Sequence, residues 1–202
     1  MIVEYRQRLL LVGYLGCFAA CAIVLQLLSG KHPNVEGSPI DNFTSALLWM
    51  TSLVCLLIAG QRLEQRPRAL MWLFLCAVFA FLAIDEMYAF HERSEHVLGD
   101  DDHVKLLQWV LTGVALVVIG RVERIVAAVR RTLVVGYVIH GVYLVIDLGD
   151  GGYFRIPYVS LSQLQWVEEL LEISAMSFYF AGFLLQFGSV INFGRRGLDT
   201  TG

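Results

Sequence analysis

The chain has 202 residues, of which 57% are hydrophobic and 16% are charged, and its formal net charge is −3. Soluble domains carry about 25% charged residues, and the apolar residues here are gathered into blocks, so the composition excludes an ordinary soluble domain and indicates an integral membrane protein. The basic residues are scattered over several loops, which excludes a basic nucleic-acid-binding surface.

Six apolar blocks follow one another along the chain, and each is close to the length of about 20 residues that crosses a bilayer as a helix. The blocks leave little chain for a separate soluble domain. The sequence therefore predicts one all-α membrane domain, residues 1–202, in contact with the lipid bilayer. We expect its spans at Leu9–Leu28, Phe43–Gly60, Ala69–Phe90, Val104–Gly120, Thr132–Asp147 and Leu170–Phe193.

Arginine and lysine predict the orientation, because they concentrate in cytoplasmic loops. With both termini in the cytoplasm, the cytoplasmic segments hold 11 of the 15 basic residues: Arg6, Arg8, Arg62, Arg66, Arg68, Arg121, Arg124, Arg130, Arg131, Arg195 and Arg196. Most acidic residues then fall on the outer side. We therefore expect a multi-pass protein of the cell membrane, of the kind found in the bacterial inner membrane.

Helix-end signals extend two of these helices on the outer side. Gly99 follows Leu98 and is typical of a helix C-terminus, so the third helix is expected over residues 69–98. Ser162 and Gln165 have the spacing of a capping box, which predicts that the last helix begins near Gln163. Thirty helical residues rise about 45 Å, against a hydrocarbon core of about 30 Å. Both helices are therefore predicted to project above the outer membrane surface.

Ionisable residues gather at the outer ends of these same two helices. At 1.5 Å per residue, Glu92 and His96 lie about 35 Å and 40 Å above the inner end of the third helix. Glu168 and Glu172 lie about 38 Å and 32 Å above the inner end of the last helix. Charges at this depth usually face a partner, a cavity or a metal, so we predict one site where the two helix ends meet.

Carboxylates together with imidazoles are ligands for zinc, iron or manganese. Glu92 and His96 are one helical turn apart and can reach the same ion. The sequence predicts a divalent metal ion with these two residues, His91, Glu169 and Glu172 as ligands, and Asp85 or Glu86 as the general base. The alternative interpretation is a solvated helix end whose charges stand in water above the bilayer.

His140 falls near the middle of the fifth block. We interpret it as a buried histidine that makes one interhelical hydrogen bond, with a haem ligand or a proton acceptor as alternatives.

The familiar motifs of hydrolases, zinc proteases, phosphate-binding loops and dinucleotide-binding folds are absent from the sequence. Three hypotheses about function remain. The first is a metal-dependent membrane enzyme that acts on a lipidic or outer-phase substrate. The second is a non-catalytic subunit of a larger membrane complex, which the short loops favour. The third is a transporter, ranked last because the second block carries no charge.

Overall fold

The computed structural model describes residues 13, 16, 20–30, 38–88, 102–123, 125–150 and 160–198. Every element in these ranges is an α-helix. Five of them are long and apolar enough to cross a membrane. They are α2 (Pro39–Gly60), α3 (Arg66–Tyr88), α5 (Asp102–Val122), α6 (Ala127–Asp150) and α7 (Leu161–Leu198), and a shorter apolar helix, Ala20–Ser29, precedes them.

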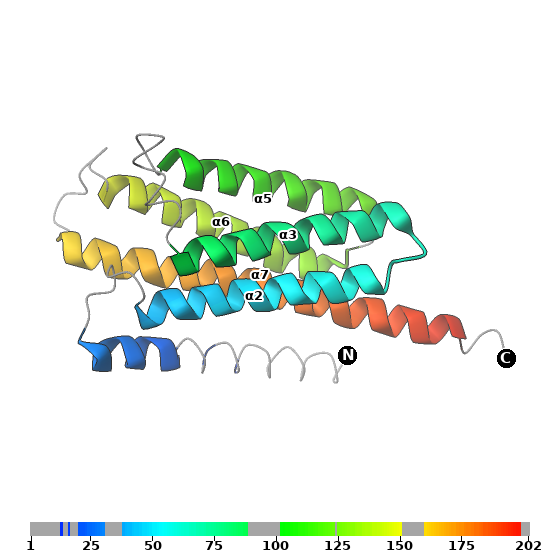
Figure 1. Ribbon diagram of the computed structural model, residues 1–202, viewed down its shortest axis with the longest axis horizontal. Helices are drawn as coiled ribbons and strands as arrows, with labels where there is room; N and C mark the ends of the chain where they lie inside the picture. The colour runs from blue at the N-terminus through cyan, green and yellow to red at the C-terminus, as the bar shows by residue number, and fades with distance from the viewer. Residues whose placement is uncertain are drawn as a thin grey trace.

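The five long helices run alternately up and down in one bundle (Figure 1). The starts of α2, α5 and α7 lie together with the ends of α3 and α6; we call this the acidic end. The opposite end, which carries Arg62, Arg66 and Arg68, is called the basic end. With 38 residues, α7 is the longest helix, and it reaches beyond α2 and α5 at both ends (Figure 1).

The helices close a ring in cross-section. α3 packs against α2 and α5, α6 packs against α5 and α7, and α7 packs against α2. Serine hydroxyls tie α2 to α3, because Ser45 donates to the Ala83 carbonyl at 3.0 Å and Ser52 donates to the Cys76 carbonyl at 2.8 Å. Such hydrogen bonds and close packing hold membrane helices together, since lipid tails remove the hydrophobic driving force between them.

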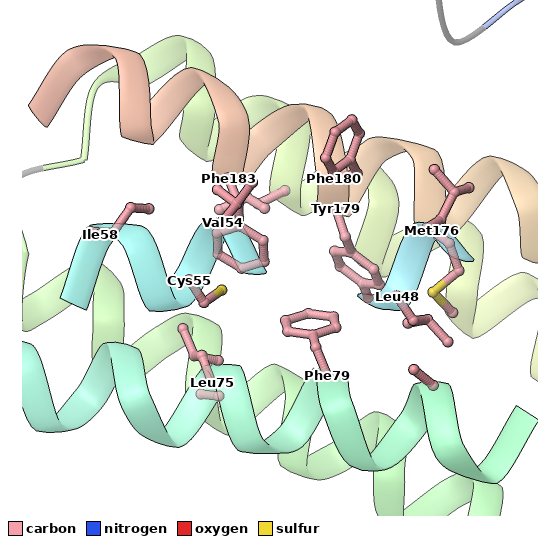
Figure 2. Packing of buried hydrophobic residues seen from close by; sticks show 14 of the residues in the cluster. Leu48, Val54, Cys55, Ile58, Leu75, Phe79, Met176, Tyr179, Phe180 and Phe183 are labelled. Atoms are coloured by element: carbon pink, nitrogen blue, oxygen red, sulfur yellow. The ribbon is translucent and has the colours of Figure 1, made fainter. Parts of the chain in front are cut away.

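Aromatic side chains fill the ring interior on the side of the basic end. Phe79 of α3 points toward Tyr179 of α7 in Figure 2, with a distance of 6.0 Å between the ring centroids. Phe183 lies 5.4 Å from Phe79 and 5.7 Å from Trp72, both in edge-to-face geometry. All four side chains are at most 1% exposed. The interior on this side is therefore filled by closely packed aromatic rings.

Two glycines allow α6 and α7 to approach each other closely. A Cβ atom on Gly136 would lie 2.9 Å from the Cβ of Phe178 and 3.2 Å from the Ala175 carbonyl oxygen. A Cβ atom on Gly182 would lie 2.5 Å from the Cδ2 of Leu133. Small residues at such contacts are common between membrane helices, because they bring the backbones together.

A buried ion pair joins two loops at the basic end. Arg62 follows α2 and donates from Nε and from a terminal nitrogen to the Glu123 carboxylate, at 3.1 and 2.9 Å. The Trp72 indole donates to the same carboxylate at 3.3 Å. The Arg68 guanidinium caps the end of α5 by donating to the Val122 carbonyl at 3.1 Å. The contacts hold α5 against α3 at this end.

The predicted all-α membrane bundle is confirmed, and five of the six expected spans coincide with described helices. Part of the first span, Leu9–Leu28, and the whole predicted extension of the third helix from 89 to 98 lie outside the described residues. The capping box of the last helix was assigned wrongly. Ser160 Oγ accepts from the Gln163 amide at 3.3 Å, and Gln163 Oε1 accepts from the Ser160 amide at 3.0 Å. The helix begins two residues earlier than the Ser162 pattern indicates, because both serines have a glutamine at the required spacing.

Candidate functional site

A cavity of about 40 Å³ lies inside the ring toward the acidic end. All five long helices contribute to its wall. α3 and α7 place carboxyl groups there, α5 adds a lysine and an amide, and α6 adds an imidazole and a phenol. The lining residues are Leu48, Leu82, Asp85, Glu86, Lys105, Gln108, His140, Tyr143, Leu144, Glu172 and Met176. Ligand sites of helical bundles lie between the helices, as this cavity does, but a volume of about 40 Å³ holds only a few atoms.

Two side chains of α5 bind carboxylates on neighbouring helices. Gln108 Nε2 donates to Asp85 Oδ2 at 2.9 Å, which ties α5 to α3. Lys105 Nζ donates to both oxygens of Asp147 at 2.9 and 3.0 Å, which ties α5 to α6. Asp85 is only 5% exposed, so the Gln108 hydrogen bond offsets part of the cost of its burial. The charge of Lys105 is largely neutralised by Asp147.

The remaining carboxyl groups of α2, α3 and α7 lie within electrostatic range of one another. Glu86 lies within electrostatic range of Glu172, Glu169 and Asp41. Glu168 lies within electrostatic range of Asp147. In total, the described side chains at the acidic end include the lysine Lys105 and seven carboxyl groups, namely Asp41, Asp85, Glu86, Asp147, Glu168, Glu169 and Glu172. Buried carboxylates are normally paired or coordinate a metal, so this cluster calls for protons or a bound cation.

His140 closes the cavity on the side of the aromatic packing. It is 6% exposed, and its Nδ1 lies 3.3 Å from the hydroxyl oxygen of Tyr179. The Tyr143 ring lies 5.8 Å from the imidazole. The interpretation of His140 as a buried histidine with an interhelical hydrogen bond is therefore confirmed, and the bond runs from α6 to α7.

Four of the seven predicted site residues lie together. Asp85, Glu86 and Glu172 line the cavity, and Glu169 lies within electrostatic range of both Glu86 and Glu172. The two helix ends therefore meet, as their depth predicted. The other three predicted ligands, His91, Glu92 and His96, lie outside the described residues.

The structure adds residues that the sequence did not single out. Asp41 belongs to the capping box of α2, where its carboxylate accepts from the Ser38 backbone amide at 2.9 Å. An acidic residue at the start of a helix is commonly a cap, so the sequence gives no further signal for Asp41. Gln108 sits among apolar residues of α5. A lone amide in an apolar run is a signal that could have marked it, since buried polar groups need partners. Lys105 could have been marked in a similar way, because it is a charged residue near the predicted outer interface.

Within the described ranges, no three His, Cys, Asp or Glu side chains are arranged to hold a metal ion. Glu169 and Glu172 could supply carboxylate oxygens to a metal only with ligands from elsewhere.

Comparison with known proteins identifies a family. A family model described as a domain of unknown function (DUF8692) matches residues 42–187. No curated protein and no solved structure matches the chain. The matched residues cover more than half of the 202 and include all of the helices that line the cavity, in whole or in part. The chain therefore belongs to the DUF8692 family.

Proposed function

We propose that this protein is a metal-dependent membrane enzyme and that the cavity at the acidic end is part of its active site. The observation that carries the proposal is the convergence of Asp85 and Glu86 from α3 with Glu172 from α7 on one small cavity within the apolar bundle. Ionisable groups placed inside a membrane protein are costly and usually serve a function.

The metal would be divalent, zinc, iron or manganese, and would sit above the cavity. Glu169 and Glu172 would provide its ligands from α7, together with His91, Glu92 and His96 from the chain after α3. Mixed carboxylate and imidazole ligands suit these ions. A cation there would also be attracted by the carboxyl groups that surround Glu86.

The contacts of Asp85 and Glu86 support different catalytic roles for the two residues. Asp85 is held by Gln108 and is mostly buried, which suits a residue that orients its neighbours. Glu86 faces Glu172 across the cavity and is the better general base, because it lies next to the ligand carboxylates. A metal would supply a Lewis acid and an activated water molecule. The aromatic packing below the cavity restricts substrates to lipids or to molecules from the phase beyond the acidic end.

Metal content tests the proposal directly. Protein purified into lipid nanodiscs without chelator is expected to contain about one equivalent of metal, which is the occupancy of a single site. Glu172→Gln and His96→Gln are expected to lose most of it. Glu64→Gln is the matched control, because Glu64 is exposed at the basic end. A metal-free wild type, or variants that keep their metal, would contradict the proposal. The thermal midpoint of each variant separates metal loss from misfolding.

Catalysis requires a separate test. Wild type and Asp85→Asn protein are incubated with a lipid extract, and the lipids are compared by mass spectrometry. Conversion that only wild type produces supports an enzyme, whereas identical lipid profiles argue against a lipid substrate.

The arginine distribution supports a setting in the bacterial inner membrane, with the acidic end toward the outer phase and both termini in the cytoplasm. Accessibility of an introduced cysteine tests this orientation. Glu64→Cys should react with a membrane-impermeant maleimide only after the cells are opened.

A subunit role in a larger membrane complex is the second candidate, and one observation favours it. α5 packs against its neighbours along only a narrow face, and an apolar groove runs along it and α6, lined by Val110, Gly113, Val114, Val117, Val118 and Tyr137. A partner helix could occupy this groove. Purification in mild detergent as a lone protomer argues against this role. A transporter is the third candidate, and the aromatic packing toward the basic end gives it little support.

A further inference from the structure

The cavity meets the physical requirements for holding water. A buried water molecule needs about 10–15 Å³ of space and two to four polar partners. The cavity volume of about 40 Å³ is enough for more than one water molecule. Glu86, Glu172, Gln108 and Lys105 all bring hydrogen-bonding groups to the wall. Apolar cavities stay empty, whereas a cavity with this volume and these polar groups has room and partners for water.

His140 is the polar group in this wall that is nearest to the aromatic packing. Its Nδ1 is held by the Tyr179 hydroxyl, and Tyr179 itself is only 1% exposed and packs against Phe79. The partner of one imidazole nitrogen determines the state of the other nitrogen. A tyrosine fixed in this way therefore holds the ring in one orientation, and its hydroxyl either donates to Nδ1 or accepts from it, depending on the tautomer.

These two observations lead to one inference, which rests on the proposed function. We propose that His140 is a functional group of the site and not only a packing residue: water in the cavity connects its imidazole to the Glu86 and Glu172 carboxyl groups, and Tyr179 is the residue that positions it. The substrate or water that occupies the cavity would meet an imidazole at one side and carboxylates at the other. Imidazole and carboxyl groups are the common general acids and bases of enzymes.

Exchange of the imidazole N–H with solvent tests the connection. Protein labelled with ¹⁵N-histidine is placed in nanodiscs, and the His140 signal is identified by its loss in His140→Gln. The wild-type ring N–H is expected to exchange with water despite its burial. Leu144→Phe fills the cavity and should slow the exchange about tenfold or more, because a buried group then exchanges only through opening of the bundle. Leu70→Phe, on the exposed face of α3, is the matched control and should leave the rate unchanged.

The positioning by Tyr179 has its own readout. The ¹⁵N shifts of the ring should report a different balance of tautomers in Tyr179→Phe than in wild type, because Nδ1 loses its hydroxyl partner. Tyr143→Phe serves as the control, because the Tyr143 ring packs near His140 while the Nδ1 bond is made by Tyr179.

Two results would overturn the inference: no detectable N–H exchange in wild type, or equal exchange in the Leu144 and Leu70 variants. If Leu144→Phe does not fold, the wild-type rate and the Tyr179→Phe tautomers still decide the question. The outcome is independent of metal content. A metal-free protein with rapid His140 exchange refutes the metal enzyme alone, and a metal-bound protein with a protected His140 refutes this inference alone.

Discussion

The ion pair at the basic end offers the sharpest test of how the bundle is held together. The side chain of Glu123 is 1% exposed and that of Arg62 is 17% exposed. Glu123 accepts two hydrogen bonds from Arg62 and one from Trp72. The substitution Glu123→Ala removes all three and leaves a guanidinium and an indole N–H without their acceptor.

The expected loss of stability follows from these contacts. Removing one partner of a buried ion pair costs about 3–5 kcal/mol. Arg62 retains some contact with water, so its charge can be partly rehydrated, and the lower half of that range applies. The indole N–H of Trp72 adds a penalty, because an unsatisfied buried donor costs about 1–3 kcal/mol. We therefore expect Glu123→Ala to lower the free energy of unfolding by about 4–7 kcal/mol.

The measurement is reversible unfolding in mixed micelles, with a double-mutant cycle. Arg62→Met should also destabilise by about 3 kcal/mol or more, because it strands the carboxylate. The double variant Arg62→Met, Glu123→Ala should recover much of the loss, since apolar replacements of a buried pair are often neutral. Glu64→Ala is the exposed control, expected within about 0.5 kcal/mol of wild type. A Glu123→Ala variant as stable as this control, or a double variant as unstable as the sum of the single ones, would refute the reasoning.

Two further predictions concern helix packing and capping, and both are checked by thermal unfolding. Gly136→Val should destabilise by about 1–3 kcal/mol or more, because its side chain would collide with α7. Gly188→Ala should be neutral or stabilising by up to about 1 kcal/mol, since a Cβ there meets no atom within 4 Å and alanine favours the helix; equal effects of the two changes would contradict the observed contact. Ser160→Ala should cost about 1 kcal/mol as the loss of a helix cap, and Ser162→Ala should cost much less. The reverse order would place the start of α7 where the sequence pattern put it.

Part of the candidate site could be predicted from depth alone. Each helix rises by a constant amount per residue, so counting along the expected helices placed the acidic ends of the third and last helices at a common level. The cost of charge in hydrocarbon then singled out Asp85, Glu86 and Glu172, which lie deepest. The partners of the carboxylates could not be found in this way, because a partner depends on which helices are neighbours and on how each is rotated about its axis.

The amino-acid sequence by itself determined that this chain forms apolar membrane helices, where they lie along the chain, and which of them carry charge near one end. Hydrophobic length sets these properties, because every backbone polar group in the bilayer must be satisfied within its own helix. Only the tertiary structure decided that α5 closes the ring between α3 and α6. That order of helices places Gln108 on Asp85, Lys105 on Asp147 and His140 on Tyr179. Those pairs depend on side chains far apart in the chain that meet only when the bundle packs.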